Sequence, residues 1–398
     1  MQQLREWKNR HIIKVLTGMR RSGKSTMLEM LADELRRNES NDQVQFYNFE
    51  DLNTLAIGDI INIHTHITEK MVADKMNYIF LDEVQNVKDF ERLVDSLFIR
   101  KNVDLYVTGS NAYLLSGELA TLLTGRYIEI SILPFSFSEY YEYTNLVNSE
   151  KLSKNESFRN FISNGGIPQM VKESIDSIDL ANDVLKGIMG TIIEKDVFAR
   201  HDIYNKHIFN KVLDFVTYSV GSMISPNSIS TYLKSEKVEI DSRTVAYYLD
   251  YLTETYLLYR VPRYDVKGKH LLQTLDKYYL SDVGFRKIRI GKKTTEDIGH
   301  LLENIVYLEL RRNYPEVYIG KLRDKEIDFV VVDRKGYISY YQVAYSTMEN
   351  STLERELAPL KAIRDSNQKY LLTMDYDLNP VYDGIRKLNV IDWLLETK

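Results

Sequence analysis

The sequence contains no cysteine, which excludes disulfides, thiolate nucleophiles and zinc sites built on sulfur, and which fits a reducing cytoplasm. It has no apolar run of about 18 residues or more, so we expect no membrane span. The amino-terminal stretch MQQLREWKNR lacks the apolar core of a signal peptide. The net charge of −5 excludes a chain that is basic throughout, so any nucleic-acid contact must come from local patches. We therefore expect a cytoplasmic protein, and its 398 residues predict about two to four domains.

A glycine-rich segment near the amino terminus fits the phosphate-binding motif G-x-x-x-x-G-K-[ST]. It follows an apolar run at residues 11–17, which predicts a buried strand, and it precedes a segment with helical periodicity. This strand, loop and helix are the context that the motif requires, although a glycine-rich turn can also arise by chance. Backbone N–H groups and the helix N-terminus would bind phosphate oxygens. The sequence therefore predicts that ATP is bound by Gly18, Met19, Arg20, Arg21, Ser22, Gly23, Lys24, Ser25 and Thr26.

An acidic pair follows a second predicted strand, residues 78–81. Asp82 would bind Mg²⁺ through water, together with the hydroxyl of Ser25, while Lys24 would reach the β- and γ-phosphates. Glu83 would polarise the attacking water, and such general-base catalysis contributes about 10²–10⁴-fold to a rate. The alternative is a surface acidic pair that caps the next helix.

A third predicted strand, residues 105–108, is followed by two further candidate catalytic residues. Ser110 and Asn111 could contact the γ-phosphate or the lytic water, or could merely cap the following helix. Arg126 follows a glycine and precedes a strand, so it is a candidate arginine finger, acting in cis or on a neighbouring subunit. An ordinary surface or salt-bridged arginine is the alternative.

Several motifs resemble those of AAA+ ATPases from bacteria and archaea that carry an uncharacterised C-terminal module. In the first part of the chain they are GMRRSGKST, FLDEVQ, TGSNAYLL, LLTGRY and LPFSFSEY. GGIPQMV, KYYLSDVGFR, LLENIVYLELRR and EIDFVV resemble the module, so the resemblance extends through the whole chain. The resemblance implies ATP and Mg²⁺ as cofactors, and because subunit rings are common among AAA+ proteins, a homo-oligomer is also considered.

The middle of the chain predicts helices and then a winged helix. Residues 181–203 read as one long amphipathic helix, and three further helices with a β-hairpin follow. Phosphate contacts from the third helix and the hairpin would give salt-dependent DNA binding. Acidic residues on the third helix dilute its positive charge, so a protein-binding role is the alternative. The candidate DNA contacts are Arg243, Arg260, Arg263, Lys267 and Lys269.

The last part of the chain predicts a helix, three strands, a helix and a strand, which resembles the restriction-endonuclease-like core. That chemistry needs acids on the helix and on the second strand, followed by an acid-x-lysine motif on the third strand. Glu303 and Asp328 fill the first two positions, but Gln342 and Ala344 stand where the last acid and the lysine belong. We therefore predict a degenerate site without nuclease activity, unless a migrated lysine, such as Lys321 or Lys325, replaces the missing one.

The predicted fold class is α/β, with an AAA+-like P-loop domain built on a parallel sheet (1–150), a helical lid or connector (151–212), a winged helix (213–290) and a restriction-endonuclease-like domain (291–398). The predicted function is Mg²⁺-dependent ATP binding and hydrolysis that drives conformational change of the C-terminal half at DNA or a protein partner. One alternative is a nucleotide-dependent regulatory switch or scaffold with slow turnover. Another is an ATP-dependent nuclease.

Overall fold

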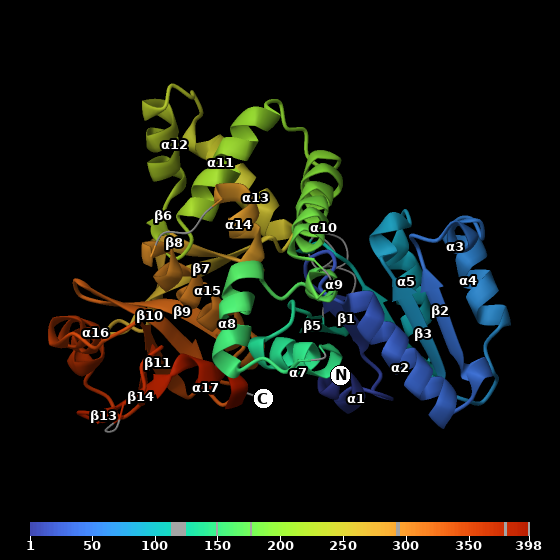
Figure 1. The fold of residues 1–398 in the computed structure, drawn as a ribbon. Coiled ribbons are helices and arrows are strands. Elements are labelled where there is room, and N and C mark those ends of the chain that lie inside the picture. Colours follow the sequence, from blue (N-terminus) through green and yellow to red (C-terminus); the bar gives the residue numbers. More distant parts are fainter. Residues whose placement is uncertain (113–124, 149, 176, 292–294, 378–379, 397–398) are drawn as a thin grey trace. The chain divides into compact units, whose positions relative to one another are not determined.

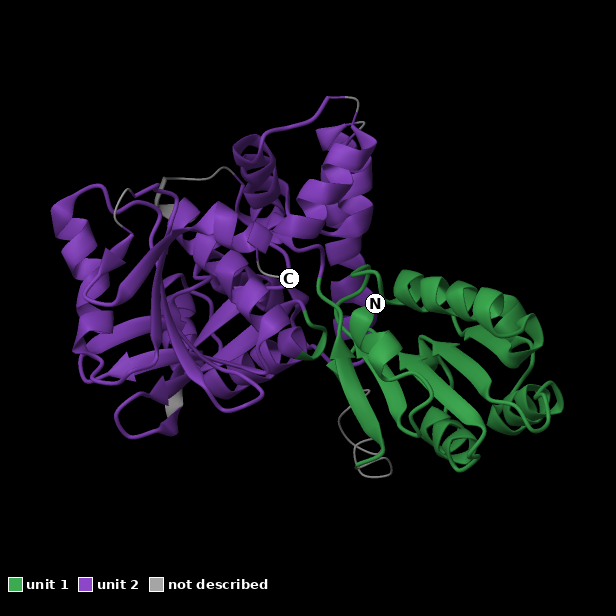
Figure 2. Cartoon of the chain, turned by 90° about the horizontal axis from the view of Figure 1, so that it is seen from below, with its two compact units in different colours: residues 1–133, 254–256 green, residues 134–253, 257–398 purple. Residues whose placement is uncertain are grey.

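The computed structural model describes the chain except residues 113–124, 149, 176, 292–294, 378–379 and 397–398. The described residues divide into two compact units, shown in different colours in Figure 2. Unit 1 comprises residues 1–133 and 254–256, and unit 2 comprises residues 134–253 and 257–398. Within the described ranges, every helix is too short or too polar to cross a membrane.

Unit 1 contains a five-stranded sheet in which every neighbouring pair of strands is parallel. Three of its strands are buried along their whole length, as expected for a parallel sheet that is covered on both faces. The strand order is β2-β3-β4-β1-β5 (Figure 1). The strands are β1 (Ile13–Thr17), β2 (Val44–Asn48), β3 (Asn77–Asp82), β4 (Val103–Thr108) and β5 (Tyr127–Ser131).

The helices of unit 1 bury apolar side chains against the two faces of this sheet. Leu28, Leu31 and Leu35 of α2 belong to one apolar cluster, while Ile63 of α4 and Leu93 of α5 belong to the other. Because the strands are parallel, their carboxyl ends meet at one edge of the sheet, where polar side chains can converge. The helices are α1 (Gln2–Glu6), α2 (Lys24–Asn38), η1 (Asn41–Gln43), α3 (Leu52–Leu55), α4 (Ile60–Glu69), η2 (Val84–Asn86) and α5 (Phe90–Phe98).

Unit 2 begins with helices whose first turns are fixed by side-chain caps. Ser136, Ser153 and Ser225 each accept a hydrogen bond from the backbone N–H three residues later, which satisfies a donor that the helix leaves free. The helices are α7 (Phe137–Val147), α8 (Lys154–Asn164), α9 (Pro168–Ser174), α10 (Ile178–Thr191), η4 (Ile192–Phe198), α11 (Lys206–Tyr218), α12 (Pro226–Ser235), α13 (Ser242–Glu254), α14 (Gly284–Ile290), α15 (Thr295–Asn313), α16 (Asn350–Ala362) and α17 (Val390–Glu396).

The prediction of a single long α-helix over residues 181–203 is wrong in one respect. α10 ends at Thr191, and η4 continues it with π-helical geometry. The backbone N–H of Ala199, for example, donates to the carbonyl of Glu194 at 3.0 Å, a spacing of i to i−5. Apolar periodicity does not distinguish this spacing from that of an α-helix.

A nine-stranded mixed sheet forms the rest of unit 2, in the order β13-β14-β12-β11-β10-β9-β7-β8-β6 (Figure 1). The hairpin expected as the wing, β7 and β8, is part of this sheet, because β7 pairs in parallel with β9. One sheet therefore crosses the boundary that we placed between residues 290 and 291. The strands are β6 (Met223–Ile224), β7 (Leu258–Asp265), β8 (His270–Leu280), β9 (Glu316–Leu322), β10 (Lys325–Val332), β11 (Ile338–Val343), β12 (Gln368–Thr373), β13 (Val381–Tyr382) and β14 (Ile385–Asn389).

Candidate functional site

The glycine-rich loop lies between β1 and α2, in the strand-loop-helix order that the motif requires. A Cβ added to Gly18 would lie 2.1 Å from the carbonyl oxygen of Ile132, so a side chain at this position would displace the backbone. Gly23, directly before α2, has a φ of +101°, which favours glycine. The 15-residue helix α2 therefore begins at the end of the loop and directs the positive end of its dipole there.

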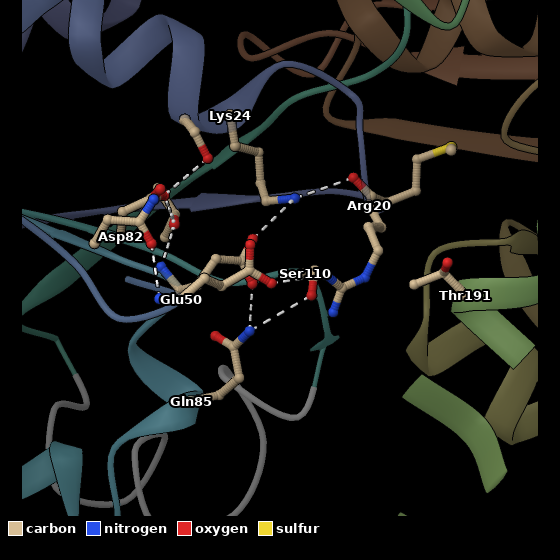
Figure 3. Close-up of polar contacts among 12 residues, drawn as sticks. Arg20, Lys24, Glu50, Asp82, Gln85, Ser110 and Thr191 are labelled. Carbon is tan, nitrogen blue, oxygen red and sulfur yellow. Dashed lines mark hydrogen bonds and ion pairs between the residues drawn. The ribbon is translucent and has the colours of Figure 1, made fainter. Parts of the chain in front are cut away.

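Lys24 is the buried cation of this loop. Its side chain is 3% exposed, and its ammonium donates to the carbonyls of Gly18 and Met19, both at 3.0 Å. The same nitrogen lies 3.9 Å from Oε1 of Glu83 (Figure 3). The ammonium is thus held between the loop and the acidic pair, where it can meet an anionic ligand.

Ser25 and Asp82 meet beside this ammonium. The Ser25 hydroxyl donates to Asp82 Oδ1 at 3.1 Å, and the Thr108 hydroxyl donates to the same oxygen. Asp82 Oδ2 is buried and has no hydrogen-bond partner within the described ranges. Burial raises the pKa of Asp82, and the hydroxyl groups of Thr108 and Ser25 partly oppose that rise. An unpartnered carboxylate oxygen beside a hydroxyl is a donor set that suits Mg²⁺, so these residues fit the cation.

Glu83 follows Asp82 in a strained backbone conformation. Its φ is +54°, a left-handed value that is uncommon for residues other than glycine and that often occurs at functional sites. Its N–H donates to the Thr108 hydroxyl at 2.9 Å, and its carboxylate accepts a hydrogen bond from the side-chain amide of Gln85. These contacts fix the carboxylate of Glu83 at the edge of the sheet, beside Lys24.

Two more predicted residues lie at this edge. Ser110 and Asn111 follow β4, and both are buried. The Ser110 hydroxyl lies 3.5 Å from Nε2 of Gln85, which also contacts Glu83 (Figure 3). The structure therefore brings Ser110 to the acidic pair, as expected from the carboxyl ends of adjacent parallel strands.

The remaining loop residues differ in exposure. Arg20 is ion-paired with Glu50, which follows β2, at 2.9 Å. Met19 and Ser22 are buried, and the hydroxyl of Ser22 has no hydrogen-bond partner among the residues described. Arg21 and Thr26 are exposed.

Arg126 does not lie at this site in unit 1. It directly precedes β5, and its carbonyl accepts from the N–H of Ile13, the first residue of β1. Arg126 therefore lies at the amino edge of the sheet, about five residues or roughly 16 Å of strand from the loop. Its guanidinium pairs with Asp95 at 2.5 Å. This position argues against an arginine finger in cis and leaves the action on a neighbouring subunit as a proposal.

The five candidate DNA contacts in unit 2 are not equally available. Arg260 is ion-paired with Asp276 at 2.6 Å, so its charge is largely compensated. The guanidinium of Arg243 donates to the hydroxyl of Tyr247 at 3.1 Å. Lys267 and Lys269 are exposed in the turn between β7 and β8, while Arg263 is half-buried. The turn lysines are thus the best placed to meet a phosphate.

The predicted degenerate nuclease residues come together in unit 2, around a lysine that sequence reasoning missed. The ammonium of Lys277, on β8, lies 2.8 Å from Glu303, 2.6 Å from Glu326 and 4.0 Å from Asp328. Gln342 accepts from the N–H of Asp328 at 3.4 Å. Lys321 and Lys325 were named only as possible replacements for the missing lysine, and in the described part of the chain it is Lys277 that lies at the centre of the acids.

Electrostatics explain how this cluster stays buried. Burial would lower the pKa of Lys277, but the carboxylates of Glu303, Asp328 and Glu326 raise it above its ordinary value. Burial and the nearby Glu303 raise the pKa of Asp328 well above that of a free carboxyl. Neither here nor elsewhere in the described ranges is a group of three or more histidine or acidic side chains placed to hold a metal ion. The ammonium of Lys277 therefore takes the place among these acids that a metal ion would occupy in a nuclease site.

Replacing Lys277 with methionine is expected to lower the free energy of unfolding by about 3–5 kcal/mol, because it leaves buried acids without a cation. Asp328, whose pKa is already raised by burial and by Glu303, would then bind a proton more readily in the folded than in the unfolded state, so the variant should recover stability as the pH falls. Urea denaturation at several pH values measures both effects.

The matched control for this variant is Lys361→Met, since Lys361 forms surface ion pairs with Glu354 and Asp383 at 3.3 and 3.2 Å. Its loss should destabilise the fold far less than the loss of Lys277, because exposed ion pairs contribute little to stability. Equal losses in the two variants would contradict the assignment of Lys277 as the buried cation.

The sequence analysis did not anticipate several residues that contact these side chains, among them Glu50, Gln85, Thr108, Lys277 and Glu326. The sequence contains a feature that could have identified Gln85, since it is a polar residue two positions after the predicted base. No such feature identifies Lys277, because it belongs to a strand that was assigned to a different domain.

Comparison with known proteins gives two family matches. A family described as an AAA domain matches residues 10–141, and a domain of unknown function, DUF8612, matches residues 155–296. An uncharacterised protein of Haemophilus influenzae is 37% identical over 398 residues, which cover 100% of this chain and 97% of that protein. An uncharacterised protein of Methanocaldococcus jannaschii is 29% identical over 365 residues, covering 89% of this chain and 79% of that protein.

Solved structures give weaker matches. A Walker-type ATPase of Pyrococcus abyssi is 16% identical with a TM-score of 0.49, and the match covers 72% of this chain and 93% of that one. Cdc6p from Pyrobaculum aerophilum is 12% identical with a TM-score of 0.30, covering 76% of this chain and 91% of that one. These scores do not establish a shared overall arrangement.

Proposed function

The chain belongs to the same family as its Haemophilus influenzae relative, and its residues 10–141 match an AAA domain; on this premise we propose that it binds and hydrolyses ATP with Mg²⁺. One observation carries the proposal. Ser25 and Asp82, the two groups expected to hold the cation, lie 3.1 Å apart, and Asp82 retains a buried oxygen without a partner among the described residues. A buried polar atom of this kind is costly unless a ligand satisfies it.

Each residue of the site has a distinct role in this proposal. The N–H groups of the loop bind phosphate oxygens, and Lys24 exchanges the carbonyls of Gly18 and Met19 for the β- and γ-phosphates. Ser25 and Asp82 would hold Mg²⁺, which would neutralise negative charge on the phosphates. Glu83 accepts a proton from the attacking water, while Ser110 and Asn111 orient the water or the γ-phosphate.

Phosphate release from ATP by the purified full-length chain tests this function. We expect turnover that requires Mg²⁺ and that stops when the metal is chelated. Turnover that is independent of the metal, or no release at any protein concentration, would contradict the proposal. The range of protein concentrations matters, because Arg126 could act only on a neighbouring subunit.

The finer function is a further part of the proposal. Nucleotide state would change the conformation of the C-terminal half, comprising the proposed winged helix (213–290) and the nuclease-like domain (291–398), at DNA or a protein partner. The nuclease-like domain would not cleave DNA, because Gln342 and Ala344 replace the acid and the lysine, and because the ammonium of Lys277 already lies among the remaining acids.

DNA binding through the β7–β8 turn can be tested by its dependence on salt. Each phosphate contact contributes about −0.9 to the slope of log K against log salt concentration for double-stranded DNA. The double variant Lys267→Ala, Lys269→Ala should therefore reduce the slope by about 2. Fluorescence anisotropy with a labelled duplex measures this slope. The control is Lys335→Ala, at an exposed turn between β10 and β11, which should leave the slope unchanged. An unchanged slope in the double variant would instead favour a protein partner.

A further inference from the structure

A glutamine joins two of the proposed catalytic side chains in unit 1. Nε2 of Gln85, in η2, donates a hydrogen bond to Oε2 of Glu83 and lies 3.5 Å from the hydroxyl oxygen of Ser110 (Figure 3). An amide NH₂ group has two hydrogens, so one nitrogen can serve both partners at once. Gln85 thus connects Glu83, directly after β3, with Ser110, the second residue after β4.

The carboxylate that Gln85 contacts depends on such support. Glu83 has left-handed backbone geometry, with a φ of +54°, and its opposite oxygen, Oε1, lies 3.9 Å from the ammonium of Lys24. If an ATP phosphate drew the ammonium of Lys24 away, Gln85 would be the side chain that still holds this carboxylate, among the residues described. The orientation of the proposed base would then depend on the amide.

The other end of the amide indicates a role beyond packing. Oε1 of Gln85 is buried and has no hydrogen-bond partner in the described part of the chain. Gln45, a buried glutamine of the same unit, has hydrogen bonds at both ends of its amide: the nitrogen donates to the carbonyl of Ile67 at 3.2 Å, and the oxygen accepts from the Tyr47 hydroxyl at 2.6 Å. A structural glutamine satisfies both ends in this way, whereas Gln85 leaves one acceptor beside the proposed base.

We propose that Gln85 is a positioning residue for ATP hydrolysis, which holds the carboxylate of Glu83 and couples it to Ser110. Contact between Ser110 and the γ-phosphate or lytic water then acts on the orientation of the base through one amide. The inference rests on the proposed function, because it assigns a role in the same reaction. It predicts an effect on turnover and little effect on nucleotide affinity.

The test compares Gln85→Leu with the control Gln45→Leu in the full-length chain. Gln85→Leu removes both hydrogen bonds at similar volume, and we expect kcat to fall about 10- to 100-fold, part of the usual contribution of a general base. KM and the affinity for a non-hydrolysable ATP analogue should change less than about threefold, since a group that acts mainly in the transition state changes kcat. Gln45→Leu should lower the melting temperature while kcat per folded molecule is retained.

A second variant keeps the test decisive if Gln85→Leu does not fold. Gln85→Asn keeps the amide but shortens the side chain by one methylene, so the amide can no longer reach both Glu83 and Ser110 from the same backbone position. The value of kcat should again fall while the affinity for the non-hydrolysable ATP analogue is retained, a split that a loss of folding alone would not produce.

The outcomes separate this inference from the proposed function. A wild-type chain that hydrolyses ATP, with an unchanged kcat in Gln85→Leu or in Gln85→Asn, would overturn the role of Gln85 alone. Equal losses of kcat in Gln85→Leu and Gln45→Leu would also overturn it. A wild-type chain without ATPase activity would instead remove the proposed function on which the inference rests.

Discussion

Replacing Glu83 with glutamine is expected to lower kcat for ATP hydrolysis by about 10²–10⁴-fold, the range that a general base contributes. The substitution keeps the size of the side chain and its ability to accept a hydrogen bond from Gln85, but it removes the negative charge that draws a proton from water. ATP affinity should be unchanged or tighter, because the neutral amide no longer attracts the ammonium of Lys24, which lies 3.9 Å away. Steady-state phosphate release and analogue binding measure the two effects separately.

Glu69→Gln is the matched control for this variant, because it makes the same chemical change at an exposed position in the last turn of α4. It should leave kcat and affinity unchanged. A Glu83→Gln chain that turns over at the wild-type rate would show that another group activates the water.

Lys24→Ala should abolish detectable turnover and weaken ATP binding about 10- to 100-fold. A hydrogen bond to a charged group is worth about 1.5–3 kcal/mol, and each 1.36 kcal/mol corresponds to a factor of ten. The buried ammonium is positioned at the mouth of the loop by the carbonyls of Gly18 and Met19, so it can transfer to a phosphate without a large movement. Equilibrium titration with a fluorescent ATP analogue measures the loss.

The control for Lys24→Ala is Lys8→Ala, since Lys8 forms a partly exposed ion pair with Glu39 at 2.8 Å. Exposed pairs of this kind contribute little to stability, so the folded fraction and ATP affinity should remain near wild type. If both lysine variants bind ATP as tightly as the wild type, the loop is not the nucleotide site.

The nucleotide site could be predicted from the sequence to the extent that its elements are local. Loop and helix follow one another without interruption, and the buried strand predicted at residues 11–17 overlaps β1, which covers Ile13–Thr17. The predicted run 105–108 likewise lies within β4, Val103–Thr108. Parallel strands also place the residues after β3 and β4 at one edge of the sheet, so the closeness of Glu83 and Ser110 follows from the strand order.

Side-chain contacts between distant segments could not be predicted in this way. Gln85 reaches Ser110 across 25 residues, and Lys277 reaches Glu303 across 26, because the fold, and not a local motif, sets these distances. The pairing of β7 with β9 had no local signal either, which explains why one sheet spans two predicted domains. For Arg126, a strand start was identified correctly, but its position at the amino edge of the sheet depends on the register with β1.

The central claim is that ATP and Mg²⁺ bind together between the start of α2 and the carboxylates after β3. Calorimetric titration of the wild-type chain with a non-hydrolysable ATP analogue, with Mg²⁺ and again with a chelator, tests it most directly. The account predicts saturable binding of one nucleotide per chain that is markedly tighter with Mg²⁺. No saturable binding with Mg²⁺, or the same affinity with and without the metal, would contradict it.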